Sequence, residues 1–301
     1  MFTAPPVLRA EVVASLPDRL RRRGESPPWM QVQQRGRQAH SFIEGPVFDE
    51  NGRLLFTDIP YGRIFGLDAG GDVELLFEYD GEPNGMKWLS PGRFLIADHK
   101  HGILLLDLPA QRITPHCDRP LLERFKGVND LHLADDGTLY FTDQGQTGLQ
   151  DPTGRVYCLG TDGTLCCLMD NIPSPNGIIL EPAGGALLVA VTRANQVWRL
   201  PLLLDGRVSK VGVLINLSGG VGPDGLARGP DGCIAVCHPG LATVWVFDGH
   251  GEPLWRIVSP VGRMTTNCAF GGPDGRTLFI TESDTGSIVS ATLPTGASVS
   301  R

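Results

Sequence analysis

One phrase recurs six times along the chain, and it restricts the fold more than any other feature. Each copy has a polar anchor residue, an apolar stretch, a glycine eight positions after the anchor and a second apolar stretch. Successive anchors are 40 to 48 residues apart. A repeat of this length indicates an array of similar supersecondary units. The anchors are Glu44, Asn84, Asn129, Asn176, Asp224 and Asn267, and the glycines are Gly52, Gly92, Gly137, Gly184, Gly232 and Gly275.

Each unit predicts short β-strands. The stretches after the glycines are short and rich in residues that favour strands, and no segment keeps a 3.6-residue apolar period over many turns. Asn-Gly and Asp-Gly pairs at several of these turns favour tight hairpins. Units of about 45 residues with three or four strands predict an all-β protein, a six-bladed β-propeller with one blade per unit. The expected second strands are Leu54–Thr57, Phe94–Ala97, Leu139–Thr142, Leu187–Ala190, Ile234–Cys237 and Leu278–Thr281.

A closed ring needs a join between the two ends of the chain. The last unit runs out of sequence after Ser287–Leu293, so it lacks an outer strand. We expect Trp29–Gln34 to supply that strand, because an open ring would expose unpaired strand edges. Residues 1–28 are then an N-terminal extension, and residues 29–301 form a single six-bladed propeller domain.

Composition argues against several classes of partner. The chain has 26 Lys and Arg against 33 Asp and Glu, so its formal charge is −7 and nucleic acid is not an expected partner. Its apolar runs are far shorter than the ~18 residues of a membrane helix, so no membrane association is expected. Seven cysteines without zinc-site spacing, and an N-terminus without a signal-peptide core, predict a cytoplasmic protein with free thiols.

Propeller geometry brings the anchors together. The first strand of each blade lies beside the central channel, so all six anchors should reach one mouth of it. Every anchor carries a carboxylate or an amide oxygen, which suits a hard divalent cation. Any one anchor could instead cap a turn, a common role of Asn and Asp. The expected cation is Ca²⁺, with Mg²⁺, Mn²⁺ or Zn²⁺ as alternatives, and the expected ligands are Glu44, Asn129, Asn176 and Asp224.

A second set of polar residues should line the same mouth. The chain runs down the first strand of a blade and returns along the second, so residues that follow the second strands reach the rim that holds the anchors. They offer aromatic and polar contacts to a small molecule. The expected substrate contacts are the anchor Asn84 and the rim residues Tyr61, His99, His101, Gln144, Arg193 and His238.

Four phrases in order, EGPVFD, GVND, SPNG and GPDG, resemble the senescence marker protein/gluconolactonase/luciferin-regenerating enzyme family. Regucalcin and diisopropylfluorophosphatase are similar six-bladed relatives, and the resemblance covers about residues 29–301. It implies one divalent ion held by the four ligands named above. It also implies hydrolysis of a lactone or related ester, with the ion polarising the carbonyl and water attacking. Asp224 stands where the family has a proposed catalytic base.

Two departures from the family pattern bear on the substrate. In animal sugar lactonases an Arg two positions before the Asn of GVND binds sugar hydroxyls, and here that residue is Gly127. We therefore expect a lactone with fewer hydroxyls than gluconolactone, or with an apolar substituent. Phosphotriesterase-like members have a His where this chain has Ser283. The alternatives are a phosphotriesterase-like hydrolase and a non-catalytic propeller that binds a partner or ligand on its rim.

Overall fold

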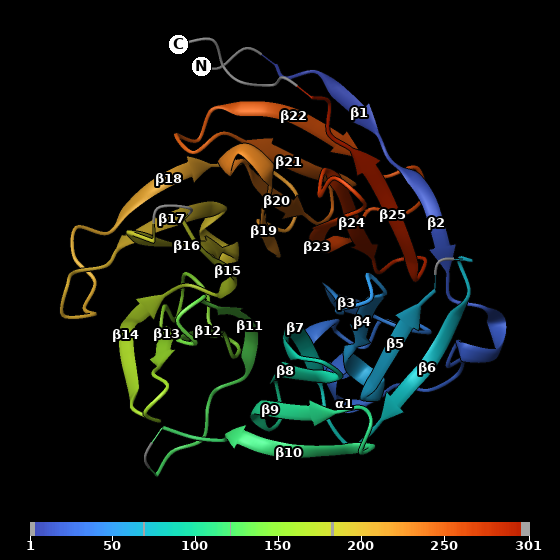
Figure 1. Ribbon diagram of the computed structural model, residues 1–301, viewed down its shortest axis with the longest axis horizontal. Coiled ribbons are helices and arrows are strands. Elements are labelled where there is room, and N and C mark those ends of the chain that lie inside the picture. Colours follow the sequence, from blue (N-terminus) through green and yellow to red (C-terminus); the bar gives the residue numbers. More distant parts are fainter. Residues whose placement is uncertain (1–3, 69, 121, 182–183, 296–301) are drawn as a thin grey trace.

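The computed structural model describes residues 4–68, 70–120, 122–181 and 184–295. Its strands form six sheets in a ring around a central channel (Figure 1). This arrangement confirms the predicted all-β, six-bladed propeller. Helical structure among these residues is limited to α1 (Pro28–Gln33) and four single 3₁₀ turns, η1 (Asp18–Leu20), η2 (Ile59–Tyr61), η3 (Thr192–Ala194) and η4 (Pro230–Gly232).

Each blade runs from an inner strand beside the channel to an outer strand at the circumference, with antiparallel neighbours. The inner strands are β3 (Ile43–Phe48), β7 (Pro83–Ser90), β11 (Val128–Leu133), β15 (Pro175–Leu180), β19 (Leu226–Arg228) and β23 (Thr265–Gly271). The second strands are β4 (Leu54–Asp58), β8 (Arg93–Asp98), β12 (Leu139–Asp143), β16 (Ala186–Val191), β20 (Ile234–His238) and β24 (Thr277–Glu282). Each second strand contains the segment expected from the sequence.

The outer half of each blade completes the sheet. The third strands are β5 (Arg63–Leu67), β9 (Gly102–Asp107), β13 (Gly154–Leu159), β17 (Gln196–Pro201), β21 (Thr243–Phe247) and β25 (Ser287–Thr292). The outer strands of the first five blades are β6 (Val73–Glu78), β10 (Arg112–Cys117), β14 (Leu165–Ile172), β18 (Gly212–Asn216) and β22 (Pro253–Val258). The sixth blade takes its outer strand, β2 (Glu11–Ser15), from the other end of the chain.

The six repeated glycines lie between the inner and second strands, as expected. All six have φ between 67° and 86°, in the left-handed region that glycine enters without a steric penalty. The turn after each inner strand therefore requires the residue type that the repeat preserves. This is why the repeat could be read from spacing alone.

The closing strand is not the one that the sequence predicted. An N-terminal segment does complete the last blade, but it is β2, which pairs antiparallel with β25. The prediction of a strand at Trp29–Gln34 is wrong, because Pro28 occupies the first helical turn and starts α1. Trp29 and Met30 then bury their side chains against Ile59. The strand that closes the ring thus lies within residues 1–28, which we expected outside the repeat.

The N-terminal segment also reaches a second blade. The short strand β1 (Val7–Arg9) pairs in parallel with β22, the outer strand of the fifth blade. Figure 1 shows β1 and β2 following each other along the outside of the fifth and sixth blades. Leu16, directly after β2, is 2% exposed and packs in the core between the sixth and first blades. One segment thus ties three consecutive blades together.

The hydrophobic core is divided among the faces where neighbouring blades meet. Six clusters of buried residues each join strands of two adjacent blades. The second strand of a blade is consequently buried on both faces. In β16, for example, every residue is 0% exposed. Strands of this kind read as continuous apolar runs rather than as alternating patterns. The packing holds the inner strands, and hence the anchors, in fixed positions.

Removing β2 should open the ring. A variant that starts at Pro17 loses the pairing with β25 and the buried Leu16, whose loss alone is typically worth about 2–5 kcal/mol. We expect its thermal midpoint to fall by about 5 °C or more. A variant that starts at Ala10 loses β1 but keeps β2, so its midpoint should fall by clearly less. Equal midpoints for the two truncations, measured by circular dichroism, would contradict this account of ring closure.

Candidate active site at the channel mouth

Five of the six anchors sit at irregularities in the inner strands, and the sixth, Asp224, lies two residues before β19. The pairing register shifts between Glu44 and Val47 in β3, and at the corresponding places in β7, β11, β15 and β23. A β-bulge re-aims the side chains beside it and often lies next to a functional site. Here the bulges accompany five anchors that are buried polar residues, whereas Asp224 is partly exposed.

Glycine follows four of the six anchors because the next blade leaves no space for a side chain. A Cβ atom on Gly85 would overlap Oδ1 of Asp130, and one on Gly225 would overlap the side chain of Asn267. Gly45 and Gly177 lie equally close to the backbone at Asn84 and at Asp224. The inner strands therefore approach each other closely around the channel, which brings their anchors within reach of each other.

Acidic residues at the ends of the second strands accept hydrogen bonds from the backbone that precedes the anchors. Asp58 accepts a hydrogen bond from the Phe42 backbone N–H (2.7 Å), and Asp143 accepts one from Gly127 (2.8 Å). Phe42 and Gly127 each lie two residues before an anchor. Asp98 and Glu282 accept equivalent bonds from Glu82 and Met264. The carboxylates of these four residues thus accept backbone hydrogen bonds close to the anchors and fix the loops that lead into the inner strands.

The four expected ligands present oxygen atoms at one mouth. Glu44 is 3% exposed, and its Oε2 accepts bonds from the Gly45 N–H and from Asn267 Nδ2 (2.8 Å). Asn129 donates through Nδ2 to Gln144 Oε1 (2.9 Å). The Asn176 side chain lies close enough to Asp224 to lower the pKa of its carboxyl group. An amide that donates through nitrogen keeps its carbonyl oxygen for another partner.

The remaining two anchors play different parts. Asn267 uses both ends of its amide within the protein, since its Oδ1 accepts the Cys268 N–H (2.8 Å) while its nitrogen holds Glu44. It therefore orients the Glu44 carboxylate, and its own amide oxygen already accepts a backbone N–H. Asn84 is 7% exposed, and its Oδ1 has no hydrogen-bond partner among the described residues. A buried amide oxygen without a protein partner is costly and calls for a bound water, ion or ligand beside it.

Asp130 is a channel residue that the sequence analysis missed. It is 1% exposed, its Oδ1 accepts the Leu131 N–H (2.8 Å), and Asn267 Nδ2 lies 3.5 Å from its Oδ2. The signal was present: the third copy of the repeat has Asp where four of the others have glycine after the anchor. That Asp fills the space beside Gly85, so it adds a third carboxylate to the mouth.

Burial raises the pKa values of three channel carboxylates, and repulsion from a neighbouring carboxylate adds to the shift of two of them. Burial is the main cause of the raised pKa of Glu44, and the charges of Asp224 and Asp130 add to it. Burial and Asp130 raise the pKa of Asp224 to about 7, against the opposing effects of the nearby Asn176 side chain and of Arg193. Burial also raises the pKa of Asp130, which Lys87 opposes. A divalent cation at this mouth would relieve the repulsion that these shifts reflect.

The carboxylates of the channel mouth could hold a hard cation only together with the side-chain amide oxygens of the Asn anchors. The described residues contain no group of three or more His, Cys, Asp or Glu side chains placed to hold a metal ion by themselves. The amide oxygens of Asn129 and Asn176, with the unpartnered oxygen of Asn84, supply the missing donors. Oxygen-only ligation with two to three carboxylates is typical of Ca²⁺ rather than of zinc.

Two expected substrate contacts, Gln144 and Arg193, line one pocket beside this mouth. The pocket has a volume of about 430 Å³ and is also lined by Ser174 and by Gln33 of α1. Gln144 links it to the candidate ligands, because its Oε1 accepts a bond from Asn129 and its Nε2 donates to Ser174 Oγ (2.9 Å). Arg193 lowers the pKa of Asp224 through its charge. The pocket therefore opens beside the residues that carry the proposed chemistry.

His99 occupies the space that a side chain at position 127 would need. A Cβ atom on Gly127 would come within 2.5 Å of His99 Nδ1, and Gly127 has φ of 149°, where other residues are strained. Burial lowers the pKa of His99, which keeps the ring neutral near pH 7. Gln33 Nε2 donates to its Nε2 (3.3 Å), so α1 holds the ring in position. The absent side chain at Gly127 is thus replaced by an imidazole from the neighbouring blade.

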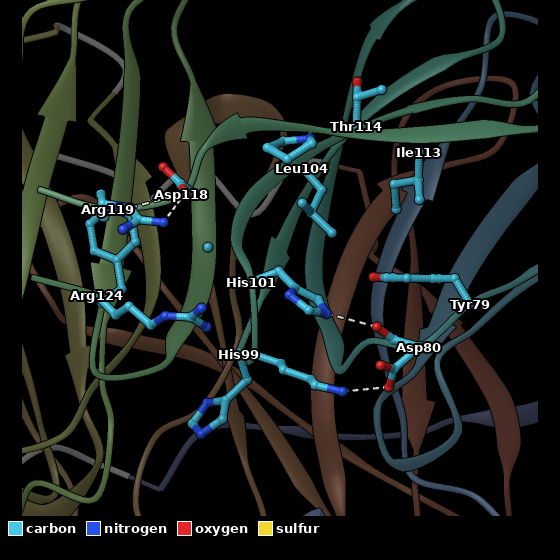
Figure 2. A pocket seen from close by; sticks show the side chains of 14 residues that line it. Tyr79, Asp80, His99, His101, Leu104, Ile113, Thr114, Asp118, Arg119 and Arg124 are labelled. Atoms are coloured by element: carbon cyan, nitrogen blue, oxygen red, sulfur yellow. Dashed lines mark hydrogen bonds and ion pairs between the residues drawn. The ribbon is translucent and has the colours of Figure 1, made fainter.

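Three other expected substrate contacts are not brought to this pocket. The Tyr61 hydroxyl donates to the Ala39 carbonyl (2.8 Å), and His238, 1% exposed, is bonded to Gly219 and Trp245. His101 shares a loop with His99, but Figure 2 shows the two rings pointing in different directions. Its Nε2 faces the Asp80 carbonyl (2.7 Å) in a separate pocket of about 360 Å³.

Comparison with known proteins gives one family and one fold. The family model described as the SMP-30/gluconolactonase/LRE-like region matches residues 42–284. The lactonase drp35 of Staphylococcus aureus (strain USA300) is 27% identical over 253 residues, which are 77% of this chain and 73% of that protein. A gluconolactonase structure from Xanthomonas campestris is 24% identical with a TM-score of 0.74, covering 84% of this chain and 86% of that one.

A calcium-binding protein, regucalcin, from Agrobacterium tumefaciens strain C58 has the same architecture. It is 23% identical, with a TM-score of 0.76 over 95% of each chain. At these identities the two structural likenesses show the shared fold. Among the residues described here, no helix has the length and apolar character that crossing a bilayer requires.

The contact between Gly127 and His99 gives a test of local packing. Gly127→Ala should lower the free energy of unfolding by about 1–3 kcal/mol, the usual cost of overpacking. Gly163→Ala is the matched control, because Gly163 also has a positive φ but nothing lies within 4 Å of the position that its Cβ would take. In a His99→Ala background the cost of Gly127→Ala should shrink toward that of the control. If urea unfolding shows that Gly127→Ala lowers the free energy of unfolding equally with and without His99, the imidazole is not the cause of the loss.

The raised pKa of Asp224 gives a test of the metal-free protein. Its folded-state pKa of about 7 lies above its ordinary 3.8, so its contribution to stability is present in acid and is lost as the pH rises through about 7. Chelated protein should therefore be less stable at pH 8 than at pH 5, by up to about 1.4 kcal/mol per pH unit per proton.

The same measurement separates Asp224 from other carboxylates. Asp224→Asn should reduce the loss, and Asp162→Asn, in an exposed turn, should not. Excess Ca²⁺ at pH 8 should restore the stability of the unmodified protein and have much less effect on Asp224→Asn. Urea unfolding that is independent of pH in the chelated protein would overturn the assignment.

Proposed function

The chain belongs to the SMP-30/gluconolactonase/LRE-like family, and on this basis we propose that it hydrolyses a small-molecule lactone with the help of one divalent cation. One observation carries the proposal. Four oxygen-bearing anchors, from four different blades, meet at one mouth of the channel, and the carboxylates among them have raised pKa values. A scaffold that only bound a partner on its rim would have no need of them. The lactonase drp35 of S. aureus supports the same reaction class.

The cation is assigned to Glu44, Asn129, Asn176 and Asp224. Their donors are all oxygen atoms, so we propose Ca²⁺ as the preferred ion, with Mg²⁺, Mn²⁺ or Zn²⁺ as substitutes. When bound, the ion supplies a Lewis acid for the lactone carbonyl. Asn267 holds Glu44 in the orientation that this requires, through the bond from its Nδ2.

Asp224 is proposed as the catalytic base. Its carboxylate takes a proton from the attacking water and returns it to the ring oxygen as the acyl C–O bond breaks, so the product is a hydroxy acid. Burial raises its pKa to about 7, which improves it as a base at neutral pH, and bound cations and Arg193 act in the opposite direction. The nearby Asn176 side chain orients the carboxylate for this transfer.

Substrate is proposed to enter through the pocket beside the mouth. Asn84 offers its unpartnered Oδ1 from within the channel, and Gln144 and Arg193 line the pocket outside it. His99 stands beside Gly127, where the family resemblance implied a sugar-binding Arg. A neutral, buried imidazole donates fewer hydrogen bonds than a guanidinium. This favours a lactone with fewer hydroxyls than gluconolactone.

The thiols support the proposed compartment. All seven cysteines are free, and Cys166 and Cys167 are exposed on β14. Exposed adjacent thiols persist in a reducing environment. We therefore propose that the protein acts in the cytoplasm, on a small molecule and not on nucleic acid.

The decisive experiment is a lactone panel followed with a pH indicator, with and without EDTA. We expect hydrolysis that EDTA abolishes and that a divalent ion restores. Glu44→Ala and Asp224→Ala should each lower kcat/KM by at least about 100-fold and weaken Ca²⁺ binding together, because each removes a carboxylate from a site with few.

Asp162→Ala, which removes an exposed turn carboxylate, is the control and should keep full activity. Full metal-dependent turnover in either channel variant would refute the site. Turnover of phosphotriesters in preference to lactones would favour the phosphotriesterase-like alternative. Ca²⁺ binding without any turnover would favour a non-catalytic propeller.

A further inference from the structure

The pocket beside the channel mouth has a wall that comes from the N-terminal segment. Gln33, the last residue of α1, and Arg35, in the turn that follows, line it opposite blades three and four. The match to the family model begins at residue 42, so this wall lies outside the region that the family shares. The pocket-lining residues used in this argument are Gln33, Arg35, Gln144, Leu149, Ser174 and Arg193.

The charge of the pocket is opposite to that of the protein. The chain as a whole carries −7, yet the residues that line the pocket include two guanidinium groups and no carboxylate. The other polar groups of the lining are amides and hydroxyls, which donate hydrogen bonds to an anion as readily as they accept them from a neutral ligand. A pocket of this composition attracts an anionic ligand.

Neither guanidinium is neutralised by the protein. Among the described residues, Arg35 and Arg193 form no ion pair, whereas several other arginines do. Arg37 is the closest comparison: it lies two positions after Arg35, and it binds Asp284 at 2.7 Å. The same turn thus directs one arginine to a protein carboxylate and leaves the other facing the pocket.

The pocket is close enough to the reacting group to hold part of the same small molecule. Gln144 lines the pocket and is bonded to Asn129, one of the proposed ligands. Arg193 also lines it, and its charge reaches Asp224. A ring at the channel mouth can therefore place a substituent between Arg35 and Arg193.

We propose that the substrate is a lactone that carries an anionic substituent, a carboxylate or a phosphate, bound between Arg35 and Arg193. The proposal rests on the lactonase activity proposed above and specifies its substrate class. It agrees with the expectation of fewer hydroxyls than gluconolactone and disfavours an apolar substituent. Leu149 is the one large apolar side chain of the lining, and it is 70% exposed.

The test compares matched lactones under one metal condition. The panel contains an unsubstituted γ- and δ-lactone, the same rings with a carboxylate, a phosphorylated ring, and gluconolactone as the neutral polyhydroxy member. We expect kcat/KM to be about tenfold or more higher for an anionic ring than for its neutral match. This preference should decrease as NaCl is raised, because exposed charges are screened. The carboxylated and phosphorylated rings decide which anion the pocket prefers.

Two variants assign the preference to its residues. Arg35→Gln and Arg193→Gln remove the charge but keep a polar side chain that donates hydrogen bonds, and each should reduce the anionic-to-neutral ratio by about five- to tenfold. Arg37→Gln is the control, because Arg37 is engaged with Asp284 outside the pocket, and it should leave the ratio unchanged. A lower ratio caused mainly by a higher KM for the anionic ring would show that the arginines bind the substituent.

The outcomes separate this inference from the proposed function. Equal kcat/KM for neutral and anionic rings, with ratios unaffected in both variants, would overturn the anionic substrate while lactonase activity stands. Preference for gluconolactone over the anionic rings would overturn it as well. No turnover of any lactone with any divalent ion would instead overturn the proposed function. In that case calorimetry with the hydroxy acid, which carries a free carboxylate, tests the pocket directly. Salt-sensitive binding that Arg35→Gln and Arg193→Gln weaken would support the anionic pocket, and the absence of such binding would overturn it.

Discussion

The close approach of neighbouring inner strands is the constraint on which the rest of this propeller depends. Around the channel, the residue after an anchor faces the next blade at a distance that excludes a Cβ atom, as at Gly85 and Gly225. The third copy of the repeat has Asp130 in place of this glycine, and its side chain fills the space beside Gly85 at the channel mouth. The same crowding that requires glycine thus forces polar anchors from different blades into one small volume, which is the condition for a shared ligand.

Crowding carboxylates in this way is unfavourable by itself, and the fold is built to withstand it. Burial and repulsion from neighbouring carboxylates, Asp130 among them, raise the pKa values of Glu44 and Asp224, so the mouth is an electrostatically strained region in the absence of a cation. The strain is contained by two supports. Rim carboxylates such as Asp58 and Asp143 fix the backbone just before the anchors, and apolar clusters between the blades fix the strands that carry them. The antiparallel pairing of β2 with β25 keeps the ring of blades closed around the channel.

Much of this could be derived from residue order, because the propeller repeats one local rule. The six turn glycines, the second strands and the anchors follow from spacing and residue type, which are local properties. The errors have local explanations too. Glu11–Ser15 is a short strand without a turn signal of the repeat, while Trp29–Gln34 looked extended although Pro28 starts a helix there. Asp130 was not predicted, because its place beside the channel depends on the space next to Gly85 of the neighbouring blade, which spacing along the chain does not reveal.

The sequence by itself determined the architecture, the blade count and the six anchors at the starts of the blades, because in a closed ring of similar units the spacing along the chain fixes position in the ring. Only the tertiary structure decided which amide oxygens are free, since that depends on partners from other blades, as for Asn129 with Gln144 and Asn267 with Glu44. It also decided that His99 fills the space beside Gly127 and that α1 carries Arg35 to the pocket. These contacts join residues from separate blades or from outside the repeat, and no periodicity along the chain encodes which of them will meet.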